Sequence, residues 1–129
     1  SFIEKRRRNF KRLEAGISGI DGIRVLPQLE NDTTKCAFYC LGMLLESKND
    51  KQREDIMSKL SNAEIGTSIY YPSPVPRLSY YKEKYGYDSV KYKNAEYISD
   101  KIIALPIGPH LDDGDVDYMI DNIKKIWSS

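Results

Sequence analysis

The chain has 129 residues, of which 40% are hydrophobic and 30% are charged, and its 20 basic and 19 acidic residues leave a formal net charge of +1. This length suits one domain with a real core and excludes two ordinary domains, while the near-zero charge argues neither for nor against an acidic partner. The longest apolar run, residues 37–45, falls far short of the roughly 20 residues of a membrane helix, and no signal peptide pattern is present, so we expect a cytoplasmic protein without membrane contact.

The chain opens with a predicted helix over residues 2–16, ended by Gly16. The apolar residues roughly on one side of this helix are Ile3, Phe10, Leu13 and Ile17. A glycine-rich turn follows, and a short strand is predicted at residues 23–26 because Pro27 stops it. The chain begins with Ser1 already inside this helix-like text, so we expect a fragment of a longer protein.

The run 36–46 predicts a strand that lies centrally in its sheet, because it is apolar at both alternating positions. A helix through Asn62 follows, with Asn49 or Asp50 as its cap. The residues expected to point inward from this helix are Ile56, Met57 and Leu60.

A third strand is predicted at residues 66–71, followed by a proline-rich segment and a short tyrosine-bearing helix over 78–86. Residues 93–105 are expected to form a helix ended by Pro106, with Ala95, Ile98 and Ile102 on one face. The last helix has the clearest pattern, an apolar stripe behind the acidic residues Asp112, Asp113 and Asp115. The stripe consists of Val116, Met119, Ile120, Ile123 and Trp127.

These elements predict a single α+β domain over residues 1–129. We expect a small, largely antiparallel sheet of three strands with helices packed on it, mostly on one face.

Residue chemistry alone predicts no self-contained active site. Cys36 and Cys40 are expected to be buried free thiols, since four residues of strand span about 13 Å and a disulfide needs Cα atoms within about 7 Å. His110, the single histidine, has no serine or cysteine in a nucleophile motif, so a loop or capping role is favoured for it. The aspartates near residue 113 lack the pattern of an EF-hand, so no metal site is predicted.

Two features keep a nucleic-acid hypothesis open. One is the basic run in residues 5–12, and the other is the crowding of tyrosines among lysines in residues 70–97, because aromatic rings among cations can hold single strands. The basic run also fits a solvated helix face, and the near-zero net charge makes nucleic acid the weaker interpretation. A free-standing interaction or regulatory module that binds a nucleotide or single-stranded nucleic acid therefore remains the alternative.

The order of phrases along the chain resembles the C-terminal domain of the DegT/StrS family of pyridoxal-phosphate-dependent sugar aminotransferases. The phrases are "KRRRNFKRLEAG", "GIDGIRVLP", "EIGTSIYYPSPVPRLSYY" and "KNAEYISDKIIALPIGPHLDDGDVDYMIDNIKKI". Together they cover essentially the whole chain, and their order is more specific than any one of them.

The resemblance implies a parent enzyme that moves an amino group, typically from glutamate, to a keto group on a nucleotide-linked sugar. It implies a homodimer in which the absent large domain carries the Schiff-base lysine and binds pyridoxal 5'-phosphate. This fragment would then hold no catalytic and no cofactor-binding residue and would be inactive alone. Some relatives replace that lysine and perform dehydration, so both reactions stay open.

The site residues implied by the resemblance lie in the segment after Gly66. The family often reads GT-x-x-HYP and soon afterwards PLH. Here Thr67 belongs to the Gly-Thr pair, Tyr70 stands at the first histidine position, Tyr71 matches, and Arg77 follows the second histidine position. The hydroxyl of Tyr70 can donate and accept, and Arg77 can offer charge to a phosphate or a carboxylate. We therefore expect this segment to form a substrate-side loop.

Overall fold

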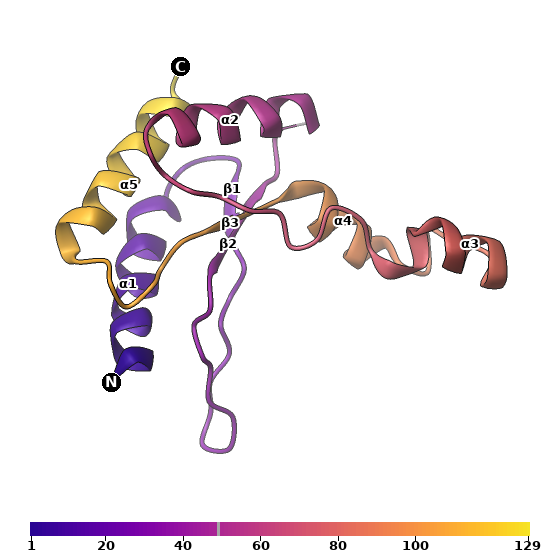
Figure 1. Ribbon diagram of the computed structural model, residues 1–129, viewed down its shortest axis with the longest axis horizontal. Helices are drawn as coiled ribbons and strands as arrows, with labels where there is room; N and C mark the ends of the chain where they lie inside the picture. The colour runs from indigo at the N-terminus through magenta and orange to yellow at the C-terminus, as the bar shows by residue number, and fades with distance from the viewer. Residues whose placement is uncertain (49) are drawn as a thin grey trace.

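Three strands form one antiparallel sheet in the order β1–β2–β3 (Figure 1). The structure is a computed structural model that describes residues 1–48 and 50–129. The strands are β1 (Ile23–Val25), β2 (Leu41–Leu45) and β3 (Ile102–Leu105). Ile23 pairs with Leu45, and Leu41 pairs with Leu105. The expected α+β class with a three-stranded antiparallel sheet is confirmed.

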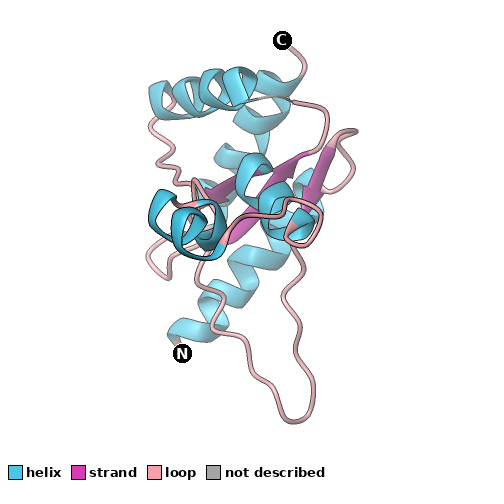
Figure 2. Ribbon diagram, turned by 90° about the vertical axis from the view of Figure 1, so that its right-hand side faces the viewer, coloured by secondary structure: helices cyan, strands magenta, loops and turns pink. Residues whose placement is uncertain are grey.

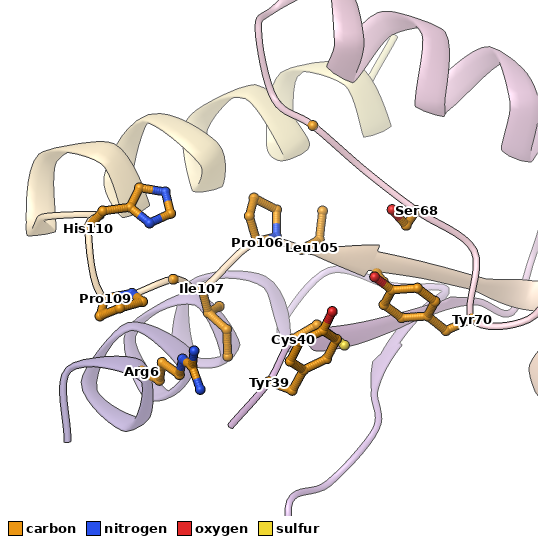
Figure 3. Close-up of a pocket in the computed structure, with 13 residues that line it drawn as sticks. Arg6, Tyr39, Cys40, Ser68, Tyr70, Leu105, Pro106, Ile107, Pro109 and His110 are labelled. Atoms are coloured by element: carbon orange, nitrogen blue, oxygen red, sulfur yellow. The ribbon is translucent and has the colours of Figure 1, made fainter. Parts of the chain in front are cut away.

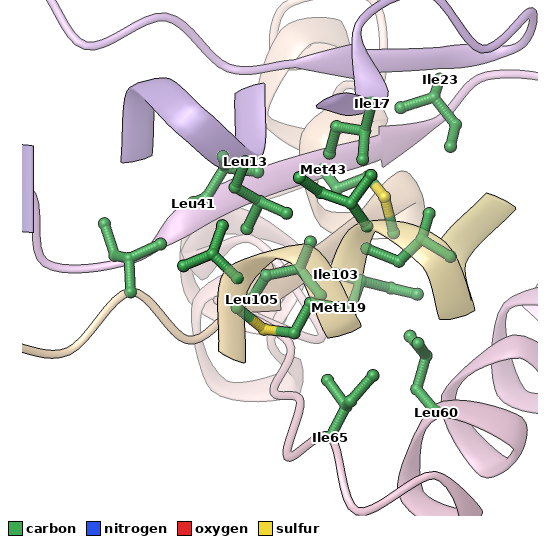
Figure 4. Packing of buried hydrophobic residues seen from close by; sticks show 14 of the residues in the cluster. Leu13, Ile17, Ile23, Leu41, Met43, Leu60, Ile65, Ile103, Leu105 and Met119 are labelled. Atoms are coloured by element: carbon green, nitrogen blue, oxygen red, sulfur yellow. The ribbon is translucent and has the colours of Figure 1, made fainter. Parts of the chain in front are cut away.

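The central strand β2 is buried at all five positions, as its apolar pattern predicted. Leu41, Met43 and Leu45 belong to the main core. Figure 4 shows Leu41 and Met43 there together with Leu13, Ile17 and Met119. Leu44 is also fully buried but lies outside that cluster, because it faces the opposite layer.

Helices cover both faces of this sheet, although most of them pack on the face of the main core, as expected. Figure 1 shows α1 (Phe2–Ile17) and α5 (Asp113–Trp127) on one side and α4 (Lys93–Lys101) on the other, where it contacts β2. A strand that is apolar at every position needs such a cover on each face.

The two terminal helices pack against each other, and each begins with a reciprocal cap. Ser1 and Glu4 form the capping box of α1, and Asp112 and Asp115 form that of α5. Most of the expected inward residues are buried: Phe10, Leu13, Ile17, Val116, Met119, Ile120 and Ile123. Trp127 is half-buried, and its Nε1 donates to the Asp21 carbonyl oxygen over 2.9 Å. Ile3 is exposed, contrary to expectation, because it lies in the first turn, where α1 extends beyond the sheet (Figure 1).

The helix α2 (Asp50–Asn62) buries Ile56 and Leu60 and leaves Met57 half-buried, close to expectation. The capping side chains expected at positions 49 and 50 lie outside the described residues.

The third strand is not the predicted one. Residues 66–71 form only a single bridge, from Ser68 to Ala104, while residues 102–105 form β3 instead of continuing a helix. The helix α4 ends at Lys101 because the apolar stretch that follows pairs with β2 and is buried on both faces. Tertiary pairing here outweighs the helical spacing of Ile98 and Ile102.

The strand β2 is also shorter than the predicted run 36–46. The backbone leaves the extended region at Phe38, where φ is +47°, so the pairing begins only at Leu41. The Phe38 ring is buried against Phe10, with ring centroids 5.4 Å apart. Burial of this aromatic ring explains why the chain turns before the strand begins.

Residues 71–92 project beyond the sheet as an arm, which α4 joins to β3 (Figures 1 and 2). The arm contains the 3₁₀ turn η1 (Val75–Arg77) and the helix α3 (Ser79–Tyr85). The expected tyrosine-bearing helix is therefore present, and Gly86, with φ of +73°, follows its last residue.

Candidate functional site

An open cavity of about 370 Å³ lies where β3 ends and the segment 66–70 crosses beside it (Figure 3). Its polar lining side chains are Arg6, Tyr39, Cys40, Ser68, Tyr70 and His110. They come from α1, from the loop before β2, from the segment after α2 and from the loop after β3. The cavity thus gathers residues that are far apart in the sequence.

Tyr39 and Tyr70 lie next to each other at this cavity, with ring centroids 6.1 Å apart (Figure 3). A side-chain hydrogen bond with Tyr70 raises the pKa of Tyr39 above its usual range. The two adjacent hydroxyls can donate to and accept from a polar ligand.

The two cysteines are free and half-buried, and neither belongs to a strand. Burial raises the pKa of the Cys40 thiol, which keeps it protonated and weakly nucleophilic. The thiol of Cys36 donates to Gln28 Oε1 over 2.7 Å. Both thiols therefore behave as structural groups, although they are less buried than expected.

The loop that carries Tyr39 is fixed to α1 by Arg7. The Arg7 guanidinium forms an ion pair with Glu30 at 2.7 Å and lies 5.2 Å from the centre of the Phe38 ring. The hydrogen bond from Arg7 holds the pKa of the Glu30 carboxyl below its usual range. These contacts place Tyr39 at the mouth of the cavity.

The loop after β3 is fixed to the same helix by Asn9. The Asn9 side chain is fully buried, and its Nδ2 donates to the carbonyl oxygens of Gly108 at 2.9 Å and Leu111 at 3.3 Å. The His110 ring folds back over Gly108, where a Cβ atom would lie only 2.4 Å from His110 Cε1. Gly108 therefore leaves the space in which the His110 ring sits.

The expected site residues do not all meet. Tyr70 lines the cavity, while Thr67 is half-buried beside it and is not among the lining residues. Tyr71 is 72% exposed and borders a second, more apolar cavity of about 300 Å³ between the proline segment and α4. Its carbonyl oxygen accepts a hydrogen bond from the Ser99 hydroxyl. The structure thus joins Tyr70 and Tyr71 at the boundary of two hollows.

Arg77 lies apart from these residues, in an internal ion pair. Its guanidinium donates to both carboxylate oxygens of Asp100, at 2.6 and 3.2 Å, and to the Ser73 hydroxyl at 3.2 Å. Close by, the Tyr87 hydroxyl contacts Glu96, and partial burial together with this hydrogen bond raises the pKa of Tyr87 to about 12. Arg77 therefore anchors the proline segment to α4.

Several lining residues were not expected from the sequence, among them Arg6, Tyr39 and His110. Arg6 reads as one cation on a solvated helix face, and His110 reads as a loop residue. Only Tyr39 could have been suspected as a site residue from the sequence, because it is a polar aromatic residue in a largely apolar run. Only folding shows that the three border one space.

A three-stranded antiparallel sheet between helical layers, with an open cavity at one edge, defines an α+β domain of the type found in sugar aminotransferases. The sequence model of the DegT/DnrJ/EryC1/StrS aminotransferase family matches residues 1–124. The chain belongs to this family. Within the described residues, no helix is long and apolar enough to cross a membrane.

Several known proteins are similar to this chain. A protein assigned as a sugar aminotransferase, Spr1654 of Streptococcus pneumoniae, has a structure that matches with a TM-score of 0.82 and 26% identity over 98% of this chain and 31% of its own. The spore coat polysaccharide biosynthesis protein SpsC of Bacillus subtilis is 26% identical over 96% of this chain and 32% of its own. A dTDP-4-dehydro-2,6-dideoxy-D-glucose 3-dehydratase of Saccharopolyspora spinosa is 22% identical over 95% of this chain and 26% of its own. The chain therefore spans about a third or less of the length of each of these relatives.

Proposed function

We propose that this chain is the small, C-terminal domain of a longer pyridoxal-phosphate-dependent sugar aminotransferase. The observation that carries the proposal is the family match over residues 1–124, supported by the structural likeness to Spr1654, which has been solved in forms named for pyridoxal and pyridoxamine phosphate. The substrates are a nucleotide-linked sugar and an amino donor, with glutamate as the expected donor, and the parent protein is a homodimer in the cytoplasm.

The residues around the cavity do not fit the cofactor itself. A pyridoxal enzyme needs a lysine to hold the aldehyde and an acidic partner for the ring nitrogen. No lysine, aspartate or glutamate lines the cavity in the described part of the chain. We therefore assign the cofactor and the chemical step to the rest of the protein, and we propose that this domain alone is inactive.

The role that remains for this domain is to form the substrate side of the active-site cleft of the parent enzyme. Tyr70 and Tyr39 present hydroxyls that suit the hydroxyl groups of a sugar. The ion pair of Arg77 and Asp100 holds the stiff proline segment beyond Tyr71. The substrate-side loop, here called the lip, therefore keeps its path without forming a strand. We assign Thr67 and Arg77 to the support of this lip.

The test uses the full-length protein supplied with pyridoxal phosphate. We expect the absorbance band of bound cofactor, its loss on adding glutamate, and an aminated sugar as product. A full-length protein that binds no cofactor would contradict the proposal. Because one relative is a 3-dehydratase, a deoxygenated product without a new amino group would establish dehydration in place of amino transfer.

A separate experiment tests the role of the Tyr70 hydroxyl in substrate binding. Tyr70→Phe removes one hydroxyl from the cavity, and we expect a higher KM for the sugar and an unchanged spectrum of bound cofactor. Tyr118→Phe is the matched control, because the Tyr118 hydroxyl donates to Ala63 in another part of the molecule. Equal KM values for the two variants would remove Tyr70 from the proposed lip.

The alternative of a module for single-stranded nucleic acid has less support. Three arginines of the basic run form ion pairs within the chain: Arg7 with Glu30, Arg8 with Asp113, and Arg12 with both Asp113 and Asp117. These pairs reduce the positive charge that a nucleic acid would meet. Salt-dependent binding of a labelled oligonucleotide at low ionic strength would revive the alternative.

A further inference from the structure

We propose that the cavity holds an anionic group of a substrate, with Arg6 as its principal ligand and His110 as a second donor. This inference rests on the proposed function in one respect, since it assigns the anion to a substrate of that enzyme. The group is either a phosphate of the nucleotide-linked sugar or a carboxylate of the amino donor. Both are oxyanions that a guanidinium binds through paired hydrogen bonds.

Arg6 differs from the other arginines of its helix. Arg7, Arg8 and Arg12 each form an ion pair with a carboxylate, at distances from 2.6 to 3.6 Å. Arg6 is half-buried at the cavity and forms no ion pair with any residue that the structure describes. Figure 3 shows its side chain between α1 and the loop after β3. A partly buried cation without a counter-charge favours an anion from outside.

His110 is placed at the same cavity by two contacts that fix its loop. Asn9 holds the carbonyl oxygens on both sides of His110, at positions 108 and 111, and the absence of a side chain at Gly108 gives the ring its position. A histidine ring so placed offers an N–H donor in either protonation state.

The remaining lining of the cavity suits an anion. No acidic side chain lines it within the described residues, so nothing there repels negative charge. The hydroxyls of Tyr39, Ser68 and Tyr70 add neutral donors around the same space. A volume of about 370 Å³ leaves room for a phosphate group and part of the molecule attached to it.

The experiment measures anion binding to the full-length protein by calorimetry, with inorganic pyrophosphate and glutarate as separate probes. Saturating the protein with pyridoxal phosphate first occupies the cofactor's own phosphate site. The variants are Arg6→Gln, Arg6→Lys and His110→Phe, and the control is Lys11→Gln, an exposed cation of the same helix that does not line the cavity.

We expect at least one probe to bind, and Arg6→Gln to weaken that probe by about tenfold or more. Arg6→Lys and His110→Phe should weaken it less, and Lys11→Gln should leave it unchanged. Binding of pyrophosphate alone identifies the phosphate, and binding of glutarate alone identifies the carboxylate. If Arg6→Gln does not fold, Arg6→Lys and His110→Phe decide the question, because each changes one donor at a cavity edge.

The proposal is overturned if neither probe binds or if the variants bind like the unaltered protein. This result is distinguishable from failure of the proposed function. A protein that binds no cofactor and transfers no amino group can still show anion binding that depends on Arg6. If the protein is an active aminotransferase and its KM values are the same in the Arg6 and His110 variants as in the unaltered protein, only the anion site is refuted.

Discussion

Asn9, in the first helix, donates a hydrogen bond of 2.9 Å to the carbonyl oxygen of Gly108, near the other end of the chain. The same amide nitrogen donates to the Leu111 carbonyl oxygen at 3.3 Å, so one fully buried side chain holds the loop between β3 and α5. This loop carries His110 and forms one wall of the cavity. The bond therefore connects the stability of the domain to the shape of its site.

Replacing Asn9 with alanine should lower the free energy of unfolding by about 1–3 kcal/mol, because two carbonyl oxygens lose their buried donor. Urea denaturation measures the change. Asn122→Ala is the control, since Asn122 is only half-buried and donates to a carbonyl one helical turn away, and it should stay within about 0.5 kcal/mol. Equal losses for the two variants would show that the buried bond contributes nothing special.

Gly16→Ala should be destabilising through overpacking. A Cβ atom at position 16 would lie 2.4 Å from Ile120 Cδ1, 2.6 Å from Cγ1 and 2.9 Å from Cγ2, so α1 and α5 would have to separate. We expect a loss of about 1–3 kcal/mol in unfolding free energy. Gly19→Ala is the matched control, because a Cβ atom there meets nothing within 4 Å.

Shortening the partner side chain tests the cause of that loss. The double variant Gly16→Ala/Ile120→Ala should lose less than the sum of its two single variants, because the smaller side chain makes room for the new methyl group. Simple additivity would mean that the clash with Ile120 is not the reason for the glycine.

Tyr87 should titrate at high pH, since partial burial and the hydrogen bond to Glu96 raise its pKa from about 10 to about 12. A pKa raised in the folded state stabilises the fold below pH 10, and this contribution disappears as the pH rises from 10 through about 12. The stability difference between the unaltered chain and Tyr87→Phe should therefore shrink over this pH range. Tyrosinate absorbance gives a direct reading, and a late titration step that survives in Tyr87→Phe would contradict the assignment.

Arg77→Ala should loosen the arm and leave the core intact. The variant loses the paired hydrogen bonds to Asp100, but this ion pair is about a third exposed, so we expect a global loss below about 1 kcal/mol. Chymotrypsin should cut residues 71–90 faster, because this segment is rich in exposed tyrosines. Lys82→Ala, on the exposed surface of α3, is the control and should be cut at the original rate.

Some elements follow from local pattern alone. The apolar stripe and acidic start of α5, the helix over α1 and the central position of β2 were all readable, because each depends on periodicity and capping within one segment. The order of phrases along the chain also identified the family, which the match over residues 1–124 confirms. The substrate-side role of Thr67, Tyr70, Tyr71 and Arg77 stays a prediction.

Other features could not be predicted from the sequence, because the local sequence was compatible with two conformations. Ile102 continues a helical spacing, yet it lies in a strand because the second edge of β2 offers a hydrogen-bonding partner. Residues 66–71 have strand composition but keep only one bridge, from Ser68 to Ala104 at the outer edge of β3. Pairing between distant segments decides such cases, and no local window contains it.

The sequence by itself determined the class of domain, the family and most of the core residues of the helices, because apolar periodicity and motif order are properties of the chain. The tertiary structure alone decided which polar residues share a space. Arg6, Tyr39 and His110 meet at one cavity because Arg7 and Asn9 draw two distant loops against the first helix. The tertiary structure also decided that Arg77 pairs with Asp100, since this carboxylate lies within hydrogen-bond reach of the Arg77 guanidinium.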